Sequence, residues 1–162
     1  MIKLLRVDER FIHGQVAFAW SNSLGINCIL IANDEVAGNK FQQKMLKMAA
    51  PTGVKFAAKT IEEAIELLHG EKIKKYDVFV IVNTVYDAMK LGLEVEEVKQ
   101  INLGNIKKKE GREPITSSVF LDAEEKQCVQ KLAEAGIWVE CRAVPTDKPV
   151  NPLKSSEGKD ND

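Results

Sequence analysis

The sequence predicts an α/β fold, with an open, mostly parallel sheet of about seven strands and helices on both faces. Three observations support this prediction. Short runs rich in apolar and β-branched residues alternate with stretches of helical periodicity, as in repeated βα units. The helical stretches begin or end at residues that commonly cap helices. The length of 162 residues suits one domain with a sizeable core and needs no second one.

The predicted strands are the runs with the strongest apolar and β-branched character. They are residues 2–7, 27–32, 54–57, 77–82, 98–103, 117–121 and 137–142. Residues 104–114 lack an apolar period and are interpreted as a turn or short hairpin, with Lys107–Lys109 in a solvated loop.

Five predicted helices lie between these strands. The first, residues 15–24, ends at Gly25, because glycine readily adopts the left-handed conformation that terminates helices. The second opens at Asp34 or Glu35 and continues until Pro51. Its apolar positions at helical spacing are Phe41, Met45, Met48 and Ala49.

Capping boxes mark two of the later helices, since each begins with a polar residue followed three positions later by a glutamate. They are Thr60 with Glu63 before residues 61–68, and Asp122 with Glu125 before a helix that runs to Ala135. Residues 84–91 form the remaining helix. Residues 1–150 are therefore predicted to form a single domain, and residues 151–162, where periodicity is lost, a disordered tail.

Composition excludes several classes of function. The 23 basic and 24 acidic residues nearly balance, so neither a nucleic-acid surface nor a polybasic membrane anchor is expected. Cys28, Cys128 and Cys141 have no paired spacing and fit reduced structural thiols better than a disulfide framework. With two histidines, no metal site is predicted, and no cofactor. The N-terminus lacks a signal peptide, and the longest apolar runs, such as residues 78–82, cannot span a bilayer, which predicts a cytoplasmic protein.

The most distinctive segment follows the first predicted strand and reads Arg6-Val-Asp-Glu-Arg-Phe-Ile-His13-Gly-Gln-Val. It places charged groups where a hydrophobic strand meets a helix, and burying such groups unpaired costs roughly 2–7 kcal/mol each. A functional site explains this cost. In parallel sheets, ligands bind beyond the carboxyl ends of the strands. The polar residues expected at that edge are Asp8 to His13, Asn33, Asp34, Asn83, Thr84, Gly104, Asn105 and Arg142.

His13 is the predicted reactive residue. It directly precedes a predicted helix, whose free N–H groups and positive dipole end favour an anion and a neutral imidazole. Arg10 offers a guanidinium that matches phosphate oxygens, and Arg142 is a candidate for a second cation. The residues predicted to bind phosphate or shape the loop are Gly14, Gln15, Asn83 and Thr84.

Three other charged residues have their own interpretations. Asp8 either orients the histidine or forms a salt bridge that fixes Arg6 or Arg10, and the salt bridge is favoured. Glu9 is interpreted as a plain surface or interface residue. His69, next to Gly70, suits a helix-end cation rather than a site.

Rival chemistries fit the sequence less well. A serine hydrolase would need a G-x-S-x-G elbow, whereas Ser21 and Ser23 lie inside a helix. A nucleotide-binding loop would need more glycines than Gly14. An aspartyl-phosphate receiver would need an acid after the third strand, where Ala58 and Lys59 stand. A phosphohistidine carrier, in which a neutral ring nitrogen attacks phosphorus in line, fits best.

The segment around His13, together with Trp20, closely resembles the N-terminal signature of the IIB component of the mannose/fructose/sorbose class of bacterial sugar phosphotransferase systems (EIIB type-4). The resemblance continues through residues 32–36, 50–51, 101–105, 119–122 and 142–145.

This resemblance implies a cytoplasmic transferase, peripherally associated with a membrane transporter. It would accept a phosphoryl group from a phosphohistidine on IIA and pass it to a sugar entering through membrane components IIC and IID. It implies phosphorylation of His13 on the δ (pros) nitrogen, with Arg10, Arg142 and Asp8 as the other family positions. It also implies an open α/β fold, often dimeric, but it does not identify the sugar.

Two alternatives remain open at this point. The chain could be a regulatory module that bears the phosphohistidine and controls a partner without sugar phosphorylation. It could also be an α/β domain that only binds a small phosphorylated ligand.

Overall fold

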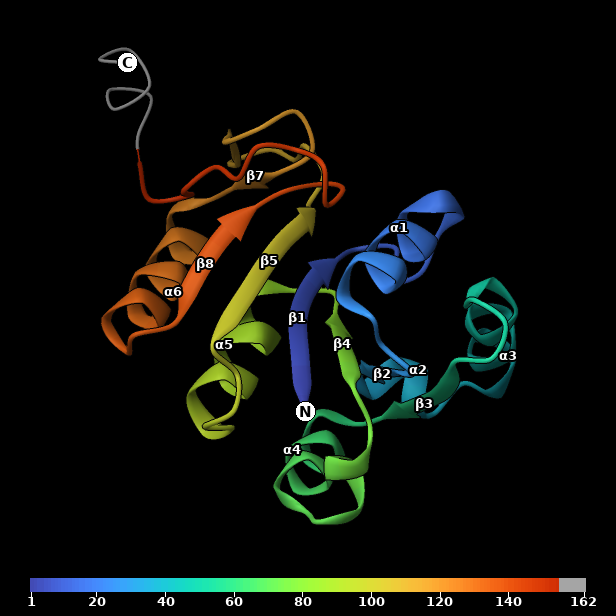
Figure 1. Ribbon diagram of the computed structural model, residues 1–162. Helices are drawn as coiled ribbons and strands as arrows, with labels where there is room; N and C mark the ends of the chain where they lie inside the picture. The colour runs from blue at the N-terminus through green and yellow to red at the C-terminus, as the bar shows by residue number, and fades with distance from the viewer. Residues whose placement is uncertain (155–162) are drawn as a thin grey trace.

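Six parallel strands form the central sheet of the computed structural model, which describes residues 1–154 (Figure 1). Their order is β3-β2-β4-β1-β5-β8. The strands are β1 (Ile2–Asp8), β2 (Cys28–Ala32), β3 (Lys55–Lys59), β4 (Val78–Val82), β5 (Gln100–Asn105), β6 (Glu113–Pro114), β7 (Phe120–Leu121) and β8 (Trp138–Cys141). The helices are α1 (Gly14–Leu24), α2 (Asp34–Ala37), α3 (Lys40–Ala49), α4 (Ile61–His69), the 3₁₀ helix η1 (Lys72–Lys75), α5 (Val85–Glu94) and α6 (Ala123–Glu134). The predicted α/β fold class is confirmed.

Helices cover both faces of the sheet (Figure 1). The buried side chains accordingly form two cores, one on each face. Alternate residues of a strand point to opposite faces, so Leu5 and Val7 of β1 pack with α4, α5 and α6, whereas Leu4 packs with α1 and α3. The strands β2 and β4 are buried along their whole length, as expected for parallel strands covered on both sides.

The sheet has six strands rather than the predicted seven in the part of the chain that the structure describes. The predicted strand at residues 117–121 lies outside the sheet. Its last two residues form β7, which pairs antiparallel with β6 in a separate small sheet, and Val119 forms an isolated bridge with Ile106. The segment is apolar because Val119 and Leu121 are buried, but an apolar run does not specify which strand it pairs with.

The capping signals identify helix starts correctly. Both predicted capping boxes are present, at Thr60 with Glu63 and at Asp122 with Glu125. The single helix predicted after residue 34 is instead two, α2 and α3. A new N-cap causes the division, since the Asn39 side chain accepts a hydrogen bond from the Gln42 N–H.

Helix α3 exposes its regular apolar stripe to solvent. Phe41, Met45 and Met48 recur at helical spacing but are 73%, 52% and 73% exposed, whereas Leu46 packs into the core. The helical period is therefore correct, but it does not reveal which face of the helix is buried.

The packed domain continues beyond residue 150. Val150 bridges to Cys141, Pro152 is buried, and Leu153 packs against the core. Residues 155–162 of the predicted tail lie outside the described residues. Cys28, Cys128 and Cys141 are free and buried, and burial raises the pKa of the Cys141 thiol to about 12.

Candidate active site

The predicted loop lies in the middle of the carboxyl edge of the sheet. Strand β1 is flanked by β4 and β5, with Val7 paired to Val82 and Asp8 paired to Asn105. The strands that follow β1 in the chain, β2 to β4, lie on one side of it, and the later strands β5 and β8 lie on the other side. The direction in which strands are added therefore reverses around β1. Ligands of open α/β sheets bind at such a reversal.

Local backbone geometry places His13 at the start of α1. Phe11 has a φ of 61°, in the left-handed region where a non-glycine residue costs on the order of 1–3 kcal/mol. Burial of Phe11 and Ile12 against the α1 face of the sheet offsets this cost. His13 is then the N-cap residue of α1, with an extended backbone and a side chain that is 15% exposed.

The Asp8 carboxylate is fully buried and organises the loop. Its Oδ2 accepts hydrogen bonds from His13 Nε2 at 2.8 Å and Arg6 Nη2 at 3.0 Å. Its Oδ1 accepts from the Arg10 main-chain N–H at 2.8 Å and from Asn105 Nδ2 at 3.2 Å. Asp8 therefore makes both of the contacts that were considered: it contacts the histidine, and it forms a salt bridge with Arg6. Its contact with Arg10 is to the main chain.

The contact between Asp8 and His13 determines the tautomer of the ring. An ionised carboxylate can only accept hydrogen bonds, so Nε2 must carry the proton. In the neutral ring, Nδ1 then keeps the lone pair that a nucleophilic nitrogen requires.

Arg6 links the two sides of the site although it is only 2% exposed. Besides binding Asp8, its Nη1 donates to Asn102 Oδ1 at 2.6 Å and to the Arg142 carbonyl at 3.2 Å. Burial lowers the pKa of Arg6 below its ordinary value, while the Asp8 and Glu140 carboxylates oppose this shift. The guanidinium lies against the backbone of Gly104, where an added Cβ would overlap it.

Arg142 is held in place by an acid and an aromatic ring. Its Nε and Nη2 donate to Glu140 at 3.0 and 3.2 Å, and its Nη1 donates to the Pro145 carbonyl at 3.1 Å. Its guanidinium carbon lies 5.1 Å from the Trp20 ring centroid, and that of Arg6 lies 5.5 Å from the same ring. A guanidinium has five N–H groups, so Arg142 retains two for a ligand.

Arg10 differs from these two arginines because it is exposed. Within residues 1–154 its guanidinium forms no hydrogen bond or ion pair, so it is available to a ligand. Gly14 and Gln15, in the exposed first turn of α1, receive no side-chain cap from His13. Their N–H groups are among the free donors of a helix N-terminus.

Asn83 and Thr84 lie at the same edge, after β4, but both already have protein partners. Asn83 Oδ1 accepts from Asn33 Nδ2 at 3.0 Å, and the Thr84 hydroxyl caps α5 by accepting from the Asp87 N–H. Their contact with phosphate stays a prediction.

A second charged network, which the sequence does not predict, fixes the loop from outside. Arg112 Nη1 donates to Glu9 at 3.0 Å, and its Nε and Nη2 donate to Glu125 at 3.1 and 3.0 Å. Although burial acts to lower it, these two acids raise the pKa of Arg112 above its ordinary value. Glu9 is thus a structural partner rather than a plain surface residue. No local signal connects Arg112 to Glu9, because they are 103 positions apart.

Other candidate features lie away from this loop. His69 ends α4, and its Nε2 contacts the Glu94 carbonyl at 2.8 Å, as suits a helix-end residue. In the described part of the chain, no group of three or more His, Cys, Asp or Glu residues could hold a metal ion. Over the same residues, no helix has the length and apolarity to cross a membrane.

Known proteins share both the sequence and the fold. The family model for the "PTS system sorbose subfamily IIB component" matches residues 2–160. A probable phosphotransferase enzyme IIB component of Streptococcus pyogenes is 36% identical over 137 residues, which cover 82% of this chain and 84% of the relative. The crystal structure of the IIBSor domain of the sorbose permease from Klebsiella pneumoniae superposes with a TM-score of 0.90 at 28% identity, covering 99% of this chain and 97% of that one.

One further relative has a different architecture. The mannose-specific EIIAB component of Escherichia coli is 28% identical over 147 residues, which cover 91% of this chain but 46% of the relative. All these relatives are phosphotransferase-system proteins, which agrees with the resemblance seen in the loop and gives no support to a purely regulatory module. The chain belongs to the sorbose subfamily of IIB components of the sugar phosphotransferase system.

Proposed function

We propose that this IIB component carries the phosphoryl group on Nδ1 of His13. The observation that supports this most directly is the hydrogen bond of 2.8 Å from His13 Nε2 to the buried Asp8 carboxylate. It holds the ring in the tautomer whose Nδ1 lone pair can attack phosphorus. It also keeps a negative charge beside the ring, where positive charge develops during the attack.

The transfer step balances without a metal or an external base. The Nδ1 lone pair forms a bond to the phosphorus of a donor phosphohistidine as the donor's P–N bond breaks, and that electron pair returns to the donor nitrogen. His13 keeps its Nε2 proton, so the product ring is an imidazolium paired with Asp8. In the onward step an acceptor hydroxyl oxygen attacks phosphorus as the P–Nδ1 bond breaks. That electron pair returns to Nδ1 of His13, and the hydroxyl proton passes to water.

Three groups are suited to bind the phosphoryl oxygens. The first is the Arg10 guanidinium, which is exposed and unpaired within residues 1–154. The second is the set of free N–H groups at the start of α1, including those of Gly14 and Gln15. The third is Arg142, whose orientation is fixed by Glu140.

The proposed donor is a IIA phosphocarrier, and the proposed acceptor is a sugar carried by membrane components IIC and IID. The combined EIIAB name of the mannose relative supports a IIA partner, because this chain matches only 46% of that protein. The proposed location is the cytoplasmic side of the membrane, in peripheral association with the transporter.

Reconstitution tests the direction of transfer. Phospho-IIA, this protein and membranes containing IIC and IID should together yield sugar phosphate, while omission of this protein should abolish it. Formation of a phosphohistidine on this protein without sugar phosphate in the complete mixture would rule out the transport role.

Asp8→Asn should reduce the rate of phosphorylation by phospho-IIA by on the order of 10²-fold or more. The amide no longer requires His13 to carry its proton on Nε2, and it provides no negative charge for the imidazolium. Rapid-quench measurement of the phosphorylated protein gives the rate. Glu9→Gln is the matched control, because Glu9 lies in the same loop and pairs with Arg112 instead of His13. Equal rate losses in both variants would refute the role assigned to Asp8.

Arg10→Ala should slow the transfer by on the order of 10²-fold while leaving the melting temperature unchanged. The reason is that its exposed guanidinium stabilises no other described group. Arg142→Ala should lower both the rate and the melting temperature, since it leaves the buried Glu140 carboxylate without its ion-pair partner. Rapid-quench kinetics and thermal unfolding separate the two effects. A normal rate for Arg10→Ala would contradict its role at the phosphoryl group.

A further inference from the structure

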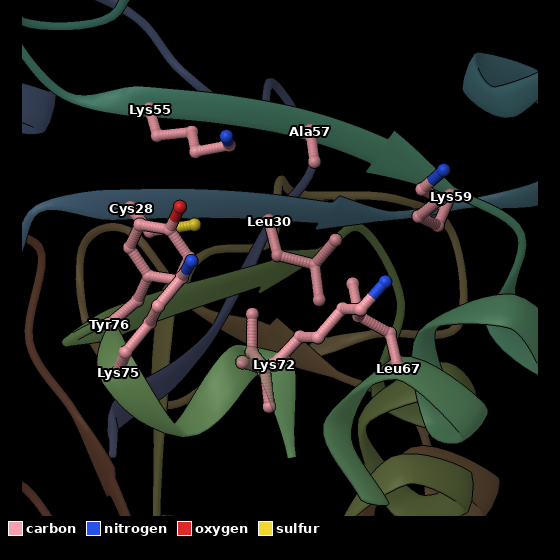
Figure 2. A pocket seen from close by; sticks show the side chains of 10 residues that line it. Cys28, Leu30, Lys55, Ala57, Lys59, Leu67, Lys72, Lys75 and Tyr76 are labelled. Atoms are coloured by element: carbon pink, nitrogen blue, oxygen red, sulfur yellow. The ribbon is translucent and has the colours of Figure 1, made fainter. Parts of the chain in front are cut away.

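A cavity of about 380 Å³ lies between strand β3, helix α4 and η1, and its lining contains no residue of the His13 loop. Its floor is apolar and contains Leu30, Ala57 and Leu67 (Figure 2), and Ile73 also lines the cavity. The volume falls in the lower part of the range of small-molecule sites, about 300–1,000 Å³. The cavity therefore has the size and the floor of a ligand site.

Four lysines surround this floor and form two pairs. Lys55 and Lys75 lie at one end, with their Nζ atoms 5.5 and 5.4 Å from the Tyr76 ring centroid. Lys59 and Lys72 lie at the other end, near Leu67 (Figure 2). The cavity thus has an apolar centre with positive charge at each end.

These lysines have no ion-pair partner in the described part of the protein, although the end with Lys59 and Lys72 adjoins a second hollow that Glu63, Glu66 and Glu71 line. No carboxylate in residues 1–154 forms an ion pair with any of the four, although Lys74, on the same 3₁₀ helix, pairs with Glu71 at 3.2 Å. Lys59 acts on Glu63 only at longer range, where it contributes to lowering the pKa of that carboxyl. Since the whole chain has a formal net charge of −1, the positive charge here is local.

Protection of the sheet edge explains the positions of only two of the four lysines. Strand β3 is an edge strand, and lysines on edge strands discourage pairing with other chains, which accounts for Lys55 and Lys59. Lys72 and Lys75 belong to η1 and approach the cavity from the opposite wall. A second copy of the chain docked through this face would bring the lysines of the two copies together and be repelled.

We propose that this cavity binds an elongated organic anion, with an apolar body on the floor and an anionic group at a lysine pair. Burying the apolar body removes water from Leu30, Leu67 and Ile73, and each lysine pair provides ammonium donors for a carboxylate, sulfonate or phosphate. An inorganic anion alone would leave the apolar floor hydrated. The ligand therefore needs both an apolar body and an anionic group.

Two fluorescent probes that differ only in charge test this requirement on the full chain. 8-Anilinonaphthalene-1-sulfonate has the apolar body and an anionic group, whereas N-phenyl-1-naphthylamine is the same body without the sulfonate. The sulfonate probe should bind at one site, at least tenfold more tightly than the neutral probe, and excess inorganic phosphate should displace it poorly. Equal affinity for the two probes, or ready displacement by phosphate, would overturn the proposal.

Charge reversal locates the site. Lys72→Glu combined with Lys75→Glu should weaken binding of the sulfonate probe at least tenfold. Lys74→Glu, a change on the same 3₁₀ helix outside the lining, should leave it unchanged. If the double variant fails to fold, Lys75→Gln gives the same comparison with a smaller loss.

Amide chemical shifts on probe binding provide an independent location. They should change around Ala57, Ile73 and Tyr76. Shifts confined to the exposed α3 stripe of Phe41, Met45 and Met48, or equal affinities in all lysine variants, would show adsorption to exposed apolar side chains and refute the site.

Discussion

His13→Ala is expected to abolish acceptance of phosphate from phospho-IIA, with no label above background. The other of the two histidines, His69, ends α4 and does not lie at the carboxyl edge beside β1. In the neutral ring the Asp8 contact on Nε2 leaves the lone pair on Nδ1 of His13, and the 15% exposure of the side chain gives a donor access to it. Loss of a covalent intermediate removes the pathway rather than slowing it, so this is the largest effect on activity expected here.

The matched control is His69→Ala, which should be phosphorylated at the normal rate. His69 lies at the end of α4, with its ring against the Glu94 carbonyl. Label that persists in His13→Ala would disprove the assignment. The position on the ring gives a second test, because long-range ¹H–¹⁵N spectra distinguish the two nitrogens. Phosphate on Nε2 would mean that the Asp8 contact breaks before transfer and does not select the nucleophile.

The place of the candidate site in the fold could be predicted from sequence because its determinants are local. Strand β1, the charged loop and the helix that begins after His13 are consecutive, and the edge rule for parallel sheets brings Asn105 and Arg142 to the same side. The choice of His13 over His69 also depended on local context, since one precedes a helix and the other ends one. The resemblance of the loop to a family then added the direction of transfer.

The buried charges around the site could not be predicted, because their partners are distant in sequence. Arg6 meets Asn102 across 96 positions and the Arg142 carbonyl across 136. A single sequence contains no signal for such pairs. The same limitation led Asp8 to be assigned an uncertain arginine partner, and it concealed the contact of Glu9 with Arg112.

The sixth predicted strand, residues 117–121, illustrates a different limit. Val119 and Leu121 are buried in the core, and this gives the segment the composition of a strand without membership of the main sheet. The composition of a segment indicates that its side chains are buried more directly than it indicates which strand the segment pairs with.

Gly104→Ala is expected to cause the largest loss of stability for its size. A Cβ at this buried position would overlap Cζ and Nη1 of Arg6. The overlap is with the centre of the guanidinium, so Arg6 must leave its place and release Asp8 and Asn102. Breaking a buried ion pair costs about 3–5 kcal/mol, which for a chain of this size lowers the melting temperature by on the order of 10 °C. Because Asp8 also holds His13, the rate of phosphorylation should fall as well.

Thermal unfolding of three variants separates this mechanism from a general intolerance of alanine. Gly38→Ala, where the added Cβ meets only ordinary contacts near 3.8 Å, should change stability by less than about 0.5 kcal/mol. The double variant Arg6→Ala with Gly104→Ala should be no less stable than Arg6→Ala alone, because the overlap disappears with the guanidinium. Additive losses of stability would mean that the added Cβ strains a group other than Arg6. Strongly non-additive losses would mean that the glycine of β5 is required chiefly to accommodate Arg6, and through Arg6 to hold the Asp8 carboxylate against the His13 ring.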